Sequence, residues 1–142
     1  MEHTPRYDGS QGYILKAGEG VSDAGDAVKA SRISTGGNLT LIESHTTGGA
    51  PRHVHSREVE YFYVLEGTIT VGCGDEEFEA GPRSFVFLPR GVPHEWNVKG
   101  ESATLLIITA PAGLEEFLDE YHSAASGDAR NQVAAKYGIK WV

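Results

Sequence analysis

Three histidines and one glutamate are the residues of this chain best suited to chemistry: His53, His55, Glu60 and His94. Imidazole nitrogen and carboxylate oxygen, with no thiolate, suit one divalent transition metal, which can be Fe, Mn, Ni, Co, Cu or Zn. Four protein ligands leave positions free on a metal that prefers five or six, and those positions can take water, a chelating substrate oxygen or dioxygen. The four residues therefore predict one catalytic metal site, with the identity of the metal left open.

The two closely spaced histidines must come from a β-strand if they are to hold one ion. His53 and His55 are two positions apart, and side chains at i and i+2 share one face of a strand. Glu60 follows His55 by five positions, which is the wrong parity for one unbroken strand. A bend around Ser56–Arg57 would restore the parity, so that Glu60 and the alternate residues after it point inward. The same spacing favours Glu60 over its neighbour Glu58 as the ligand.

The segment from Gly81 to Asn97 supplies the fourth ligand. It contains an apolar run, a turn at Pro89–Gly91 and then His94, which is typical of a strand, a corner and a returning strand. This arrangement can bring His94 back toward the first three ligands.

Together the two stretches resemble the paired motifs of the cupin family, in which a His-x-His, a glutamate and a later histidine from antiparallel strands meet at one metal inside a small barrel. The intervals from His55 to Glu60 and from Glu60 to Gly67 fit the first motif. The second motif departs only in the lengths of its turns. The resemblance covers about residues 35–112. It implies an all-β fold with a single cupin β-barrel, also described as a double-stranded β-helix or jelly roll.

The rest of the chain is consistent with one domain of many short strands. We expect N-terminal strands and a loop over residues 1–34, as part of the barrel or of a dimer interface, and the barrel core over 35–112. The expected N-terminal strands are Gly12–Lys16 and Val28–Ile33, and Glu66–Gly67 is expected to form a turn. A short C-terminal helical tail over 113–142 follows from two patterns. Apolar residues recur three and four positions apart from Leu114 to Tyr121, and a second helix is expected from Asp128 to Tyr137.

Composition limits the partners. The 142 residues carry a formal net charge of −8, which argues against nucleic acid and anionic membranes as partners. Residues 1–20 lack the apolar core of a signal peptide, and the longest apolar run, Leu105–Ile108, is too short to span a bilayer. We therefore expect a cytoplasmic protein. Its single cysteine, Cys73, excludes an internal disulfide.

Residues that share parity with a ligand on its strand should face the same interior. On this basis four residues are candidates for the wall of a substrate pocket, or simply for barrel filling: Phe62, Val64, Phe87 and Trp96. Tyr61 and Tyr63 should then point to the other side of the sheet, where exposed aromatic side chains favour a homodimer.

The remaining histidines have weaker claims to a role. His45 alternates with Leu41 and Glu43, so it can face the cavity as a proton carrier, but we prefer a histidine that faces solvent or is hydrogen-bonded in the core. His3 and His122 are expected at the surface.

The resemblance limits the function without fixing it, because cupins include dioxygenases, other metal enzymes and plain binding proteins. The leading hypothesis is a dioxygenase-type oxidoreductase. Its substrate would be a small aromatic, diketone or enol-like molecule that chelates the metal, and Glu60 would act as a catalytic base as well as a ligand. One alternative is a non-redox isomerase or polyketide cyclase that uses the metal as a Lewis acid. Another is a non-enzymatic cupin that binds a small molecule or metal.

Overall fold

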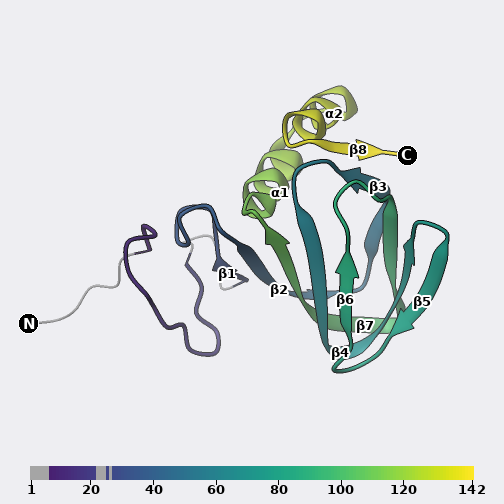
Figure 1. The fold of residues 1–142 in the computed structure, drawn as a ribbon, viewed down its shortest axis with the longest axis horizontal. Helices are drawn as coiled ribbons and strands as arrows, with labels where there is room; N and C mark the ends of the chain where they lie inside the picture. The colour runs from purple at the N-terminus through teal and green to yellow at the C-terminus, as the bar shows by residue number, and fades with distance from the viewer. Residues whose placement is uncertain (1–6, 22–24, 26) are drawn as a thin grey trace, which may run out of the picture.

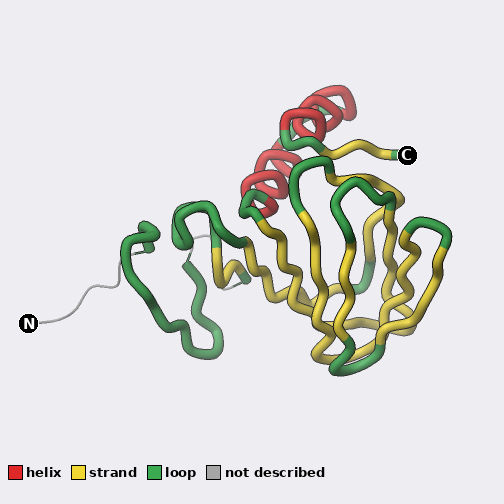
Figure 2. Tube along the Cα trace, viewed as in Figure 1, coloured by secondary structure: helices red, strands yellow, loops and turns green. Residues whose placement is uncertain are grey.

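The computed structural model describes residues 7–21, 25 and 27–142 and shows an antiparallel β-barrel with two helices at one end (Figures 1 and 2). Its elements, in chain order, are β1 (Val28–Ala30), β2 (Thr40–Thr46), β3 (Gly49–His55), β4 (Val59–Cys73), β5 (Glu76–Ala80), β6 (Phe85–Leu88), β7 (His94–Ala110), α1 (Leu114–Ser123), α2 (Gly127–Lys136) and β8 (Ile139–Trp141). The expected all-β barrel with a helical tail is confirmed.

The barrel is organised by its two longest strands, β4 and β7, which contain 15 and 17 residues. They pair with each other along most of their length. Strand β7 also pairs with β2 through its C-terminal half and with β3 through its N-terminal half. One strand thereby joins several parts of the barrel, and it brings β3 next to the start of β7, where the candidate ligands lie.

The turn expected at Glu66–Gly67 is a bulge inside β4. The pairing of β4 with β7 changes register on both sides of Glu66. Gly67 has φ +78°, and a Cβ atom there would lie 2.4 Å from the carbonyl oxygen of Ser102. A glycine is needed because the two backbones approach closely, and the bulge bends the strand without ending it.

Alternation along β4 places the apolar core inside the barrel. Phe62, Val64 and Ile69 are fully buried, and Val71 is 1% exposed. The Phe62 ring packs edge-on against Trp96 of β7, with the ring centroids 5.4 Å apart. Each large apolar side chain buried in this way stabilises the fold by roughly 1.5–3 kcal/mol, so the strands that carry the candidate ligands lie on a rigid support.

The N-terminal segment contains less strand than expected, whereas the C-terminal segment contains both expected helices and one additional strand. Residues 12–16 form no strand, and the second expected N-terminal strand is reduced to the three residues of β1. Both C-terminal helices lie where the sequence places them, and Ser126 caps α2 by accepting a hydrogen bond from the backbone N–H of Ala129. The short strand β8 was not predicted. Of the described helices, none is both long and apolar enough to cross a membrane.

Candidate metal site

The alternation of β3 turns His53 and His55 toward the interior. His53 pairs with His94 of β7 on one side and with Trp141 of β8 on the other. All three imidazoles are buried, with exposures of 7% for His53, 3% for His55 and 1% for His94. Pairing between β3 and β7 therefore brings two ligands from one motif to the third ligand from the other.

The bend expected at Ser56–Arg57 is present and restores the parity. Glu60 begins the inward series of β4 and is 5% exposed. The backbone N–H of Ser56 donates to the carbonyl oxygen of Gly138 at 2.9 Å, and the Ser56 hydroxyl donates to the same oxygen at 3.0 Å. Residue Gly138 has φ +73°, and a Cβ there would lie 2.5 Å from the Ser56 hydroxyl oxygen. The C-terminal segment thus fixes the bend that aims Glu60.

The four donor groups converge on one point. One ligand atom from each of His53, His55, Glu60 and His94 lies within 4.8 Å of the other three. The His53 and His55 Nε2 atoms are 3.1 Å apart, and His94 Nε2 lies 3.3 Å from Glu60 Oε1. Metal–nitrogen bonds of about 2.1 Å place neighbouring ligands about 3.0–3.4 Å apart, so these residues fit a single ion.

The outward nitrogens of the β3 histidines fix their tautomers. His53 Nδ1 lies 2.7 Å from the carbonyl oxygen of Pro51, and His55 Nδ1 lies 2.5 Å from Glu58 Oε1. Both oxygens can only accept, so each Nδ1 carries a hydrogen and donates. The two neutral rings then turn Nε2 lone pairs toward each other, and only a cation between them, a proton or a metal ion, satisfies both. Hydrogen bonds of this kind hold metal-binding histidines in position.

The His94 ring adds an independent sign of a bound cation. It is 1% exposed, and neither of its nitrogens has a hydrogen-bond partner among the described residues. Buried polar groups are almost always paired, so an orphaned imidazole beside three other donors indicates a missing partner. A metal ion at the point of convergence would be the partner of Nε2, the nitrogen that faces Glu60.

Charge and burial act differently on the two β3 histidines. Burial lowers the pKa of His53 to about 4, although the hydrogen bond to Pro51 acts in the opposite direction. This ring is therefore neutral near pH 7, as metal binding requires. Burial also lowers the pKa of His55, but the hydrogen bond to Glu58 and the charges of Glu60 and Glu58 outweigh it and raise the pKa above 6.5. A metal therefore competes with a proton at His55 more than at His53.

Glu58 is the functional residue that the sequence reasoning missed. It was the rejected alternative to Glu60 as a ligand, and it does not belong to the converging set. Instead its side chain is buried, with the residue 8% exposed, and it accepts the hydrogen bond that orients His55. A carboxylate three positions after a candidate histidine, directly after the predicted bend at Ser56–Arg57, was the available signal.

The part of the chain that carries the site matches a known family. Residues 40–109 match the cupin domain family. The chain belongs to the cupin superfamily. Quercetin 2,3-dioxygenase of Bacillus subtilis (strain 168) is 26% identical over 122 residues, which cover 82% of this cupin and 36% of that relative. The chain therefore spans little more than a third of the relative's length.

Solved structures resemble the barrel. A variant of Streptomyces PAC13 with uridine has a TM-score of 0.50 and 20% identity, covering 56% of this chain and 64% of that chain. KdgF from Halomonas sp. has a TM-score of 0.50 and 16% identity, covering 56% of this chain and 76% of that chain. At sequence identities this low, the likeness concerns the fold alone.

A cavity of about 670 Å³ opens onto the cluster of candidate metal ligands in this cupin. His53, His55 and Glu60 line it, and so do Phe62 and Trp96, two of the four residues expected at a pocket wall. Val64 faces inward as expected, but it is fully buried in the barrel core and is not among the lining residues. The cavity therefore presents metal-binding and aromatic groups on one continuous surface.

Phe87 lies on the opposite side of the sheet from its expected position. It is 48% exposed, and its ring contacts Tyr61 with centroids 5.4 Å apart. In the pairing of β4 with β6, Glu60 faces Leu88 and Tyr61 faces Phe87. Cross-strand partners share a face, so Leu88 points inward with Glu60 while Phe87 points outward. The apolar run of β6 offered no residue whose direction was already known.

The other histidines fall on different surfaces. His45 is exposed, and its Nδ1 lies 2.7 Å from the hydroxyl of Thr104, so it faces solvent, as preferred, and not the cavity. His122 is exposed as expected but stands among the cavity-lining residues. The expectation for His3 lies outside the described residues.

Proposed function

We propose that this cupin is a metal-dependent oxidoreductase of the dioxygenase kind. Its substrate is a small molecule with adjacent hydroxyl and carbonyl oxygens on an aromatic or otherwise flat framework. The observation that carries the proposal is the cavity of about 670 Å³, which joins three candidate ligands to the rings of Phe62 and Trp96. The likeness to a protein named quercetin 2,3-dioxygenase supports it.

When bound, the metal supplies positive charge that stabilises the enolate of a chelating substrate and, if redox-active, a means of reaction with dioxygen. The chain supplies preorganisation. Pro51 and Glu58 fix the rings of His53 and His55, so these donors need little rearrangement during the reaction.

Glu60 takes the proton of the substrate hydroxyl in this proposal. Its carboxylate lies 3.3 Å from His94 Nε2 and 4.0 Å from His55 Nε2, and Glu60 lines the cavity. A substrate oxygen at the cluster would come within hydrogen-bonding reach of it, which is the first requirement of a general base. The aromatic side chains around it limit access of water to the reacting oxygens.

The test is oxygen uptake by protein loaded separately with Fe, Mn, Ni, Co and Cu, across a panel of flavonols and diketones. Uptake that needs the metal and is lost in Glu60→Ala supports the proposal. Absence of uptake with every metal and substrate contradicts it.

Two alternatives use the same cluster and have different signatures. A non-redox isomerase or polyketide cyclase would convert its substrate without air, and as well with zinc as with iron. A binding cupin would retain an unchanged small molecule or metal after purification. Anaerobic turnover, and mass spectrometry of what co-purifies with the protein, separate these from the oxidoreductase.

A further inference from the structure

Residues of the barrel form only part of the cavity that opens onto the candidate metal ligands. Residues of the C-terminal segment, 113–142, form much of its wall: Phe117, Leu118, Tyr121, His122, Asn131 and Trp141. At about 670 Å³ the space is within the range of roughly 300–1,000 Å³ typical of sites for drug-sized ligands. A chelator with a single small ring would leave much of this wall uncovered.

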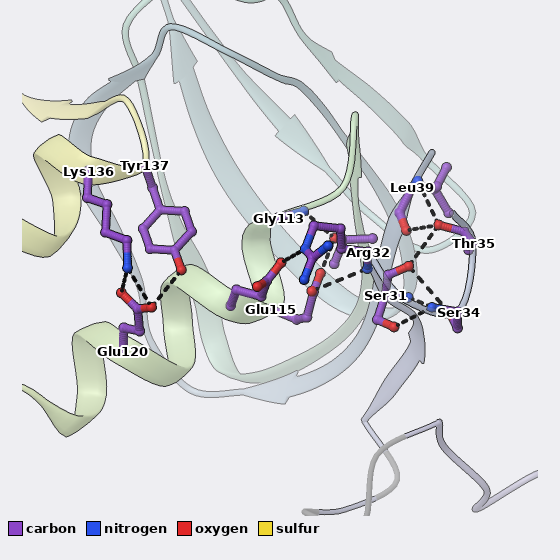
Figure 3. A network of polar contacts seen from close by, with 12 residues as sticks. Ser31, Arg32, Ser34, Thr35, Leu39, Gly113, Glu115, Glu120, Lys136 and Tyr137 are labelled. Carbon is purple, nitrogen blue, oxygen red and sulfur yellow. Dashed lines mark hydrogen bonds and ion pairs between the residues drawn. The ribbon is translucent and has the colours of Figure 1, made fainter. Parts of the chain in front are cut away.

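The C-terminal segment is fastened to the barrel at its beginning. The hydroxyl of Thr40 on β2 donates to the Glu115 carboxylate and accepts the backbone N–H of Gly113 at 2.9 Å. The backbone N–H of Arg32 also donates to Glu115 at 3.3 Å, and Figure 3 shows Arg32, Gly113 and Glu115 close together at the start of α1. The start of α1 is therefore held against β2.

The two helices of the segment are joined to each other, and its end is fastened to the barrel. The carboxylate of Glu120 accepts hydrogen bonds from Lys136 Nζ and from the Tyr137 hydroxyl, each at 2.9 Å to Oε1, which joins α1 to the end of α2 (Figure 3). Strand β8 then pairs with β3, and the backbone N–H of Val142 donates to the carbonyl oxygen of Arg52 at 3.2 Å. The segment is a fixed wall of the cavity.

The aromatic rings of this wall form a continuous series of contacts that begins at the candidate ligand His53. Trp141 contacts His53 with ring centroids 5.4 Å apart, and Tyr121 lies 6.0 Å from Trp141 and 5.2 Å from Phe117. The exposed side chains of His122 and Asn131 also line the cavity. A ligand whose oxygens reach the candidate metal ligands would therefore lie against an aromatic surface.

We propose that residues 113–142 are the specificity element of this cupin and select ligands in which a flat aromatic body extends beyond the chelating oxygens. Tyr121 is the central residue of that surface, and it contacts the body of the ligand rather than its chelating end. The choice of chelating end rests on the proposed function, whereas the choice of an extended aromatic body rests on the wall.

Two chelators with the same hydroxy-ketone group test this: maltol, which has one ring, and 3-hydroxyflavone, which has three. Zinc-loaded protein is titrated with each by calorimetry, and the bound zinc is measured afterwards. The parent should bind 3-hydroxyflavone more tightly than maltol. Replacing Tyr121 by Ala should weaken flavone binding by about tenfold, a typical value for an aromatic contact together with its buried area, and leave maltol binding unchanged.

Two further variants keep the test independent of folding. Tyr121→Leu retains an apolar side chain against Phe117 and should still lose most of the flavone preference, whereas Tyr121→Phe should retain it. Phe78→Ala removes an aromatic ring of β5 that is 37% exposed and does not line the cavity, and it is the matched control.

Equal weakening of maltol and flavone in Tyr121→Ala and Tyr121→Leu would place the effect on the metal site and overturn the inference. A parent protein that prefers maltol, or that binds neither chelator, would overturn it too. Flavone preference without oxygen uptake by any metal-loaded form would contradict the dioxygenase proposal while leaving the specificity element in place.

Discussion

Replacement of Glu58 should weaken metal binding although Glu58 is not one of the four converging donors. Its Oε1 accepts the His55 Nδ1–H at 2.5 Å, and both residues are buried. Hydrogen bonds to charged groups contribute about 1.5–3 kcal/mol, and loss of an orienting partner typically reduces metal affinity by about 10–100-fold, or about 1.4–2.8 kcal/mol. The two ranges agree, so we expect a loss of that size for Glu58→Ala near pH 8.

The loss should shrink as the pH falls, because Glu58 has two opposing effects. It orients the His55 ring for the metal, and it also helps to raise the pKa of that ring above 6.5, which favours the competing proton. Removing Glu58 lowers the pKa of His55, so less of the ring is protonated at a given pH. Near pH 6 the reduced protonation of His55 offsets part of the metal affinity lost with the orienting hydrogen bond. Near pH 8 proton competition matters less, so the loss of that hydrogen bond dominates.

Competition with a chromophoric zinc chelator at both pH values measures the effect. Glu58→Gln, which keeps an oxygen that can accept the hydrogen bond, should lose less affinity than Glu58→Ala. Glu77→Gln changes an exposed carboxylate on β5 and should match the parent. Thermal unfolding of each metal-free variant confirms that it is folded during the titration. Parental affinity for Glu58→Ala at both pH values would refute the reasoning.

Three other substitutions test the remaining structure. His94→Ala removes an orphaned buried donor and should abolish metal retention in elemental analysis, while the solvent-facing His45→Ala should retain the metal; retention by His94→Ala would mean that the second motif has been misread. Gly138→Ala should lower the free energy of unfolding in urea by at least about 1 kcal/mol, because φ is +73° and the new Cβ meets Ser56; an unchanged midpoint would contradict this. The expected homodimer is proposed to use the outer aromatic face of Tyr61, Phe85 and Phe87, so Phe85→Glu should give a monomer in analytical ultracentrifugation, and a parent that is already monomeric would rule the dimer out.

Three of the four candidate ligands could be related to one another by local rules, whereas His94 depended on the resemblance of the second motif. The positions of His53 and His55 follow from strand alternation, and Glu60 follows from them once a bend is allowed at Ser56–Arg57. No such tie existed for Phe87. Every residue of β6 is apolar, so either alternate set could have faced inward, and only the pairing of Glu60 with Leu88 decides between them.

What the sequence could not supply is the support that the C-terminal segment gives to the ligands. Strand β8 has only three residues, too few for alternation to be recognised, yet it pairs with the histidine strand and places Trp141 against His53. Gly138, just before it, holds the bend that aims Glu60. One segment both supports the ligand strand and forms the outer cavity wall. Substitutions in its different parts should therefore have different effects. Those near Gly138 should affect metal retention, and those at Tyr121 should affect the choice of ligand.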